Sequence, residues 1–194
     1  MKLEDPGLEN AALRFVPLEA AHRDLVLQSG VEDAIWRWMP ALRGGVSFAQ
    51  YFDFMIQAQG QGLYTSFALF NKNDDQFLGI TGYTDTNKQH RRTRIAMVWF
   101  APELFEPILY TYAQLGLIQR AYDWGARRIE WSLNPDNTFM MTQLETIGPT
   151  KEATLRNYER LASGQWADKV VFSMLRPEMA EAIKALQHRL EGAS

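Results

Sequence analysis

The middle of the chain contains three stretches rich in aromatic and β-branched side chains, a composition typical of β-strands: residues 63–70, 77–86 and 93–101. The polar segments NKNDDQ and NKQHRR separate these stretches. Because short turns join neighbouring strands that run in opposite directions, the pattern predicts a three-stranded antiparallel meander. The other elements of the chain have to be arranged around this sheet.

A helix and a further strand are predicted after the meander. Apolar residues recur at spacings of three and four between residues 107 and 124, which indicates an amphipathic helix: Ile108, Tyr112, Leu115, Ile118 and Tyr122. Gly125 ends this helix, and RIEWSL at residues 128–133 reads as a short buried strand. The change from a meander to a strand-helix-strand pattern predicts an α/β (α+β) fold with mixed, mostly antiparallel strands.

Further elements are predicted on both sides of this central part. A strand at 13–18 precedes helices at 19–29, 31–39 and 48–58, the last with Ser47 and Gln50 as an N-terminal capping box. Then follow a helix at 136–147, strands at 152–161 and 169–175, and a final helix at 177–191. Together they predict a single domain over residues 1–194, with its core at about 13–175. Its twisted sheet should have about six to seven strands flanked by helices.

Charge and composition exclude several classes of function. The 194 residues carry 20 Lys and Arg against 23 Asp and Glu, so the net charge of −3 offers no basic field for nucleic acid. The absence of cysteine excludes disulfides, thiolate nucleophiles and cysteine-ligated metals. The acidic start MKLEDPGLEN does not resemble a secretory signal, and the apolar stretches fall short of the ~18 residues of a membrane span. We therefore expect a cytoplasmic protein without a membrane partner.

Three segments carry a resemblance to known proteins. Residues 79–103, GITGYTDTNKQHRRTRIAMVWFAPE, combine a Gly-x-x-Gly-Tyr stretch, a polar loop with a His-Arg-Arg triplet and an aromatic-rich strand. Residues 144–158, LETIGPTKEATLRNY, contain a helix end, a glycine and a strand, and residues 168–175, DKVVFSML, form a last strand. These segments, with the order of elements from 13 to 175, resemble the GNAT N-acetyltransferase superfamily, in its ribosomal-protein N-acetyltransferase (RimJ/RimL-like) branch.

The resemblance implies an enzyme that transfers an acetyl group from acetyl-coenzyme A to a primary amine. The acceptor would be a small molecule or a peptide that attacks directly, with no covalent enzyme intermediate and no metal. In this superfamily a splayed strand holds the pantetheine arm, and the start of the next helix holds the pyrophosphate. The positions that match these roles are Val98, Trp99, Phe100, Phe105, Ile108, Leu109 and Tyr110, and Asn137 on the later helix matches a further cofactor-binding position. Relatives often pair, so a homodimer is also expected.

The sequence departs from the superfamily where the phosphates of coenzyme A are bound. Residues 102–110, PELFEPILY, lack the spaced glycines and the Arg or Gln of relatives, and they include Glu106 and Pro107. A carboxylate repels phosphate and proline removes an amide donor, so both changes weaken pyrophosphate binding. Met140 stands where relatives carry a serine near the coenzyme A sulfur. A second hypothesis is therefore a degenerate GNAT fold that serves as a ligand-binding or protein-interaction module.

Four residues are candidates for catalysis: Asp85, His90, Asn137 and Tyr158. Asp85 could orient the amine or cap a turn, and His90 could be a base or an exposed loop residue. Asn137 could contact the cofactor or cap its helix. Without a serine at position 140, protonation of the leaving thiolate would fall to Thr138, Tyr158 or water.

Aromatic residues are candidates for the acceptor site. Trp36 and Trp38 belong to the early helices, which cover the acceptor pocket in GNAT relatives, and Tyr83 lies on the second meander strand. Each of them could instead belong to the core, and for Tyr83 and Trp99 on the meander strands the core is the commoner place of an aromatic residue.

Overall fold

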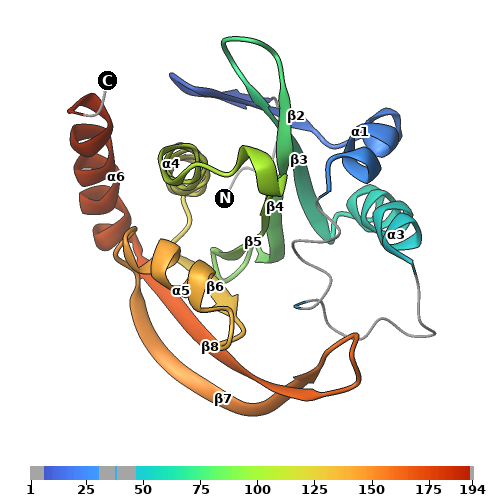
Figure 1. Cartoon of the computed structure of the whole chain (residues 1–194). Coiled ribbons are helices and arrows are strands. Elements are labelled where there is room, and N and C mark those ends of the chain that lie inside the picture. The colour runs from blue at the N-terminus through green and yellow to red at the C-terminus, as the bar shows by residue number, and fades with distance from the viewer. Residues whose placement is uncertain (1–6, 31–37, 39–46, 193–194) are drawn as a thin grey trace.

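The computed structural model describes residues 7–30, 38 and 47–192, with Met97 described by its backbone alone (Figure 1). Eight strands of these residues form one sheet in the order β1-β2-β3-β4-β5-β6-β8-β7. The strands are Leu8–Glu9 (β1), Leu13–Pro17 (β2), Tyr64–Asn71 (β3), Phe77–Asn87 (β4), Arg92–Phe100 (β5), Arg128–Leu133 (β6), Thr150–Arg160 (β7) and Trp166–Leu175 (β8). Neighbouring strands are antiparallel, except for the parallel pair β5 and β6. The predicted meander is β3-β4-β5.

The sheet has one strand more than the upper end of the predicted six to seven. The addition is β1, which pairs Leu8 with Phe15 and Glu9 with Arg14 at the edge of β2. Two residues are too few to show an alternating pattern, so the sequence did not indicate this strand. The hairpin of β7 and β8 is also longer than predicted, because β7 begins at Thr150 and β8 begins at Trp166, in the segment between the two predicted strands.

The helices follow the predicted order. They are Ala20–His22 (η1), Arg23–Gln28 (α1), Phe48–Gly60 (α3), Pro102–Leu104 (η3), Pro107–Asp123 (α4), Thr138–Glu145 (α5) and Arg176–Glu191 (α6). The predicted capping box is present at α3, where the Ser47 hydroxyl accepts from the Gln50 amide and the Gln50 side chain accepts from the Ser47 amide. Apart from Trp38, the predicted helix at 31–39 lies outside the described residues. No helix in the described part of the chain is long and apolar enough to cross a bilayer.

Helices cover both faces of the sheet (Figure 1), with α4 and α6 on one face and α1 and α3 on the other. Side chains alternate along β3, so this strand contributes residues to the cores on both faces of the sheet. Phe67 and Leu69 belong to the larger core under α4, whereas Ala68 between them belongs to the smaller core under α3. The sheet is therefore the central layer of the fold, and α4 lies beside the parallel pair β5 and β6.

Candidate functional site

Strands β5 and β6 separate after a short paired region. Their parallel pairing joins Arg92, Thr93 and Arg94 to Arg128, Ile129 and Glu130, and it ends there although both strands continue. A bulge also interrupts β5, because β4 advances two residues, from Ile80 to Gly82, while β5 advances three, from Trp99 back to Ala96. Diverging strands and a bulge leave backbone amide and carbonyl groups without strand partners.

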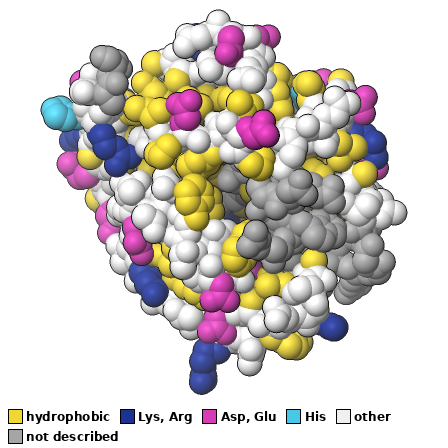
Figure 2. Space-filling view, viewed as in Figure 1, with side chains coloured by type: hydrophobic (Ala, Val, Ile, Leu, Met, Phe, Trp, Pro, Cys, Tyr) yellow, Lys and Arg dark blue, Asp and Glu magenta, His cyan; other side chains and the backbone are white. Residues whose placement is uncertain are grey.

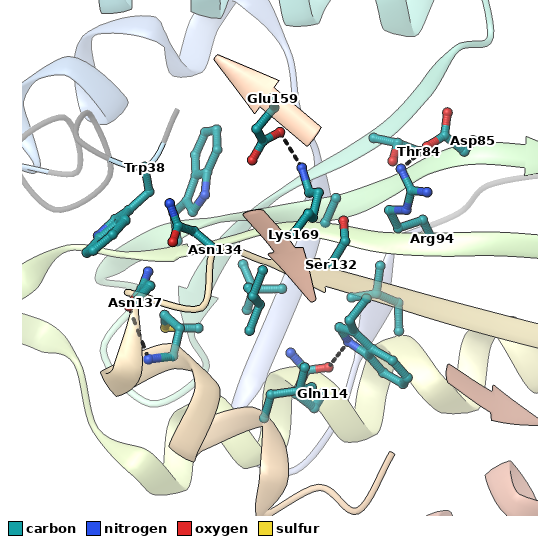
Figure 3. A pocket seen from close by; sticks show the side chains of 18 of the residues that line it. Trp38, Thr84, Asp85, Arg94, Gln114, Ser132, Asn134, Asn137, Glu159 and Lys169 are labelled. Atoms are coloured by element: carbon teal, nitrogen blue, oxygen red, sulfur yellow. Dashed lines mark hydrogen bonds and ion pairs between the residues drawn. The ribbon is translucent and has the colours of Figure 1, made fainter. Parts of the chain in front are cut away.

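A cavity of about 380 Å³ opens where the two strands diverge (Figure 3). Its wall is built from β3, β4, β5, β6, α3, α4, α5 and the hairpin of β7 and β8. The described residues that line it are Trp38, Tyr51, Tyr64, Thr84, Asp85, Arg94, Ile95, Ala96, Val98, Trp99, Tyr110, Gln114, Trp131, Ser132, Leu133, Asn134, Asn137, Met140, Leu144, Glu159 and Lys169. Figure 2 shows hydrophobic side chains gathered across the middle of one face of the molecule. The cavity combines such apolar surface with a few polar groups, which is the usual make-up of a small-molecule site.

Two ion pairs lie in the wall of this cavity (Figure 3). Asp85 at the end of β4 pairs with Arg94 of β5, and Glu159 of β7 pairs with Lys169 of β8. The second pair is the more buried, with side-chain exposures of 13% for Glu159 and 17% for Lys169. Both carboxylates lie where a cationic group could approach them from the cavity.

An irregularity in β7 brings Glu159 to this position. Between Leu155 and Glu159 β7 advances four residues, while β8 advances only two, from Lys169 to Ala167. Asn157 within the irregular stretch has φ of 48°, and its amide donates to Oδ1 of Asp168 at 2.9 Å. Extra residues in one strand change the direction of the following side chains, which explains how an acidic residue on a β-hairpin comes to line the cavity.

Two amide side chains in the wall have donors without partners. Oδ1 of Asn134 accepts from the Asp136 amide at 2.8 Å, and Oε1 of Gln114 accepts from Nε1 of Trp131 at 3.1 Å. Because both donating groups are N–H donors, each accepting atom has to be an oxygen, which fixes the orientation of both amides. Nδ2 of Asn134 and Nε2 of Gln114 are then left buried without a hydrogen-bond partner.

Tyrosines on the wall stay neutral. Burial raises the pKa of the Tyr51 and Tyr110 hydroxyls. The pKa of Tyr64 is raised as well, first by burial and then by the charge of nearby Asp85. Loss of a proton in an apolar place costs more than in water, so these hydroxyls serve as hydrogen-bonding groups at neutral pH.

The start of α4 lies beside the cavity but does not form its wall. Of the described lining residues only Tyr110 and Gln114 come from α4, and none comes from residues 102–109. Phe105 packs inward, with its ring 5.6 Å from that of Phe100 and 4.9 Å from that of Phe139. Glu106 is the exposed N-cap, Pro107 follows at the first helical position, and no side chain caps the helix.

The structure brings some of the predicted site residues together. Asp85, Val98, Trp99, Tyr110 and Asn137 line the cavity, as does Trp38. The side chain of Asn137 also caps α5 by accepting from the Met140 amide at 3.2 Å. The predicted helix cap is therefore present, and the place of Asn137 in the cavity wall leaves the predicted contact with the cofactor open as a prediction.

Other predicted residues lie outside the wall. His90 is in the exposed turn between β4 and β5, and half-exposed Tyr158 lies beneath Lys169, whose Nζ is 5.5 Å from the ring centre. Tyr83 is fully buried in the larger core, and its hydroxyl donates to the Leu117 carbonyl at 2.7 Å. Phe100, Phe105, Ile108 and Leu109 also pack against that core instead of lining the cavity, and Trp36 lies outside the described residues.

Several wall residues had not been singled out from the sequence: Arg94, Gln114, Ser132, Asn134, Glu159 and Lys169. Their places depend on pairing between distant strands and on the bulges, neither of which a local pattern reveals. Ser132 brings a hydroxyl to the wall, which Met140 also lines. Among the described residues, no three His, Asp or Glu side chains are grouped as metal ligands would be.

Comparison with known proteins places this geometry in a fold class. No established family profile matches the sequence. It is 28% identical over 129 residues, 62% of this chain and 67% of the relative, to an uncharacterised N-acetyltransferase, p20, from Bacillus licheniformis. A probable GNAT-family acetyltransferase structure from Chromobacterium violaceum matches with a TM-score of 0.82 and 26% identity over 93% of this chain and 91% of the other. The chain therefore has the fold of the GNAT acetyltransferases.

A more distant structure has bound ligands. Spermidine N-acetyltransferase from Vibrio cholerae, in complex with CoA and spermine, matches with a TM-score of 0.74. The match covers 88% of this chain and 99% of the other at 14% identity, which supports the likeness of fold.

Proposed function

We propose that this protein is an N-acetyltransferase that moves an acetyl group from acetyl-coenzyme A to a primary amine by direct attack. The observation that carries the proposal is the cavity between the diverging strands β5 and β6, in a chain with the GNAT fold. The resemblance of residues 79–103 favours the ribosomal-protein N-acetyltransferase branch within that fold. An amine acceptor is also supported by a structural neighbour that is a spermidine N-acetyltransferase.

The reaction needs three events at this cavity. The amine nitrogen loses a proton and bonds to the thioester carbonyl carbon, the carbon–sulfur bond breaks, and the thiolate leaves and takes up a proton. We assign polarisation of the carbonyl to backbone groups at the bulge of β5, where the regular pairing with β4 is interrupted. Holding both reactants in one small cavity supplies a further part of the rate enhancement.

Glu159 is the group that we assign to the acceptor amine. Its carboxylate is mostly buried and faces the cavity, so it attracts the ammonium form of the amine and takes its proton. Lys169 of β8 pairs with this carboxylate. Asp85 is more exposed, and its pairing with Arg94 places it at the side of the cavity (Figure 3).

The test is release of free coenzyme A from acetyl-coenzyme A in the presence of primary amines. Because the chain has no cysteine, a thiol-reactive dye measures the product without background from the protein. We expect amine-dependent release. Glu159→Gln should lower kcat/KM at pH 7 by about 10²-fold, in the range of general-base catalysis, and the remaining rate should rise with pH as the free amine deprotonates.

Glu181→Gln is the matched control, because Glu181 is an exposed carboxylate paired with Lys184 on α6. It should leave kcat/KM unchanged. If no amine promotes release of coenzyme A, the enzymatic proposal is wrong, and the fold serves as a ligand-binding or protein-interaction module. That alternative draws on the start of α4, where Glu106 and Pro107 make a poor phosphate site.

A further inference from the structure

We infer that this chain recognises its acyl donor through the thioester and pantetheine end, and that the nucleotide of coenzyme A contributes little to binding. The inference rests on the proposed function and specifies which part of the donor the site reads. Two independent observations lead to it: unpaired hydrogen-bond donors on residues of the cavity wall, and a helix start that is unsuited to phosphate.

Asn134 provides the clearest of the unpaired donors. The residue is only 6% exposed, and its oxygen is committed to the Asp136 amide in the turn that follows β6. Nδ2 can therefore act only as a hydrogen-bond donor. It has no partner, and Asn134 is a residue of the cavity wall. A buried donor without an acceptor is costly, so the wall at Asn134 is complementary to a ligand oxygen.

Gln114 and Arg94 add donors of the same kind. Gln114 is fully buried, its oxygen accepts from Trp131, and it also interacts with the hydroxyl of Tyr110. Its Nε2 nevertheless has no hydrogen bond of acceptable geometry, and neither has the buried Nε of Arg94.

All three of these unpaired wall atoms are N–H donors. An ammonium acceptor brings only further donors, whereas an acylated pantetheine brings the thioester oxygen and the carbonyl oxygens of two amides. The oxygens that can accept from these N–H groups therefore belong to the pantetheine arm of the acyl donor, and not to the amine.

The start of α4 offers little to a pyrophosphate. Pro107 has no amide hydrogen, and the Tyr110 amide is already bonded to the Glu106 carbonyl at 3.0 Å. Ile108 and Leu109 keep free amides by their position in the first turn, but the exposed carboxylate of Glu106 precedes them. The ring contact between Phe105 and Phe139 joins this loop to the first turn of α5, and neither residue lines the cavity.

The size of the cavity agrees with recognition of the arm. About 380 Å³ is near the lower end of the roughly 300–1,000 Å³ of small-molecule sites. Such a volume accommodates a thioester arm and a small amine, while a nucleotide would have to lie outside it.

The test compares binding of coenzyme A, pantetheine and adenosine 3′,5′-bisphosphate to the full chain by isothermal titration calorimetry. We expect the dissociation constant of pantetheine to lie within about threefold of that of coenzyme A, and we expect no binding of the bisphosphate at millimolar concentration. A preference of thirtyfold or more for coenzyme A over pantetheine would overturn the inference, and so would absence of binding by both thiols.

Matched variants locate the recognition. Asn134→Asp keeps the oxygen that accepts from Asp136 but removes the donor, and it should weaken binding of both thiols about tenfold, the value of one net hydrogen bond. Asn71→Asp is the control, because Oδ1 of Asn71 accepts from the Asn73 amide in the same kind of turn, in the hairpin between β3 and β4. Unchanged binding in Asn134→Asp would contradict the inference.

Two more variants examine a second donor of the wall and a hidden phosphate site. Gln114→Glu keeps the acceptor for Trp131 and removes the donor, so it should also weaken both thiols. Glu106→Gln should leave both affinities unchanged. A Glu106→Gln protein that bound coenzyme A more tightly, but not pantetheine, would show a pyrophosphate at α4 and overturn the inference.

Failure of this inference is distinguishable from failure of the proposed function. Amine-dependent release of coenzyme A together with a strong preference for the whole nucleotide would overturn the inference and leave the acetyltransferase standing. Equal binding of pantetheine and coenzyme A without transfer to any amine would support recognition of the arm and contradict the enzymatic proposal.

Discussion

Two lysine–glutamate pairs of this chain differ chiefly in burial. Lys169 and Glu159 lie in the cavity wall with side chains 17% and 13% exposed, whereas Lys184 and Glu181 lie on the surface of α6 with side chains 72% and 76% exposed. Exposed pairs contribute little because water screens them. In a buried pair, the loss of one partner leaves the other charge without compensation.

Lys169→Met should therefore lower the free energy of unfolding by about 2–3 kcal/mol, somewhat less than for fully buried pairs because both groups keep some access to water. Lys184→Met is the control and should change it by less than about 0.5 kcal/mol. Urea unfolding of the three proteins measures the difference. Equal effects of the two substitutions would show that Glu159 is solvated in the absence of Lys169.

At the level of single residues, the sequence predicted those cavity positions that lie in recognisable motifs. Asp85 and Trp99 belong to the segment that resembles the superfamily, and Asn137 stands at a helix start. Glu159 and Lys169 could not be predicted in this way, because their meeting depends on the irregular register of β7 and β8. A carboxylate in a strand looks like an ordinary solvent-facing residue until that register is known.

Among the elements, β4 approaches the backbone of β3 closely at the second glycine of its motif. A Cβ atom on Gly82 would lie 2.3 Å from the Thr65 carbonyl oxygen and 2.9 Å from Cα of Ser66, both in β3. These are backbone atoms of the paired strand, which cannot move away without breaking the pairing of β3 and β4. The close approach of the β3 backbone thus explains the second glycine of the Gly-x-x-Gly-Tyr stretch.

Gly82→Ala should destabilise the fold by about 2–3 kcal/mol, the upper part of the range for overpacking, because the added methyl group meets backbone. Gly60→Ala makes a matched comparison, since Gly60 ends α3 and a Cβ there has no neighbour within 4 Å. It should stabilise the protein by up to about 1 kcal/mol through helix propensity. Thermal unfolding should show a lower midpoint for Gly82→Ala and a higher midpoint for Gly60→Ala. An unchanged midpoint for Gly82→Ala would show that the backbone of β3 moves to make room for the methyl group.

The elements themselves were largely predictable from local composition. Aromatic and β-branched stretches became strands, helical spacing became α4 and α6, and the capping box marked the start of α3. What local patterns could not supply were β1, which has two residues, and the bulge of β5 that frees backbone groups at the cavity. Both follow from pairing between strands and carry no signal of their own in the sequence.

Across the whole molecule, charged groups form a chain over one part of the sheet. Arg94 links Asp85 to Glu130, and Arg128 links Glu130 to Glu152, whose Oε1 also accepts from the Ser173 hydroxyl at 2.7 Å. This chain connects strands β4, β5, β6, β7 and β8, whose order no local pattern in the sequence fixes. It borders the cavity at Asp85 and Arg94 and ties the two diverging halves of the sheet together.

The same chain makes stability depend on acidity. The hydrogen bond from Arg128, with a second from Ser173, lowers the pKa of Glu152 from 4.5 to about 2. A carboxyl whose pKa is lower in the folded state stabilises that state above its unfolded pKa. This contribution is complete above about pH 5 and is lost as the pH falls from about 4.5 through 2.

Glu152→Gln should accordingly lower the free energy of unfolding at pH 7 by on the order of 1 kcal/mol, a modest value because the Glu152 side chain is 38% exposed and screened by water. The difference from the unmodified protein should shrink as the pH is lowered towards 2, because the native Glu152 is then protonated as well. Urea unfolding at a series of pH values measures it, with Glu181→Gln as the exposed control. A difference that stays constant down to pH 2 would mean that Glu152 acts through packing and not through its charge.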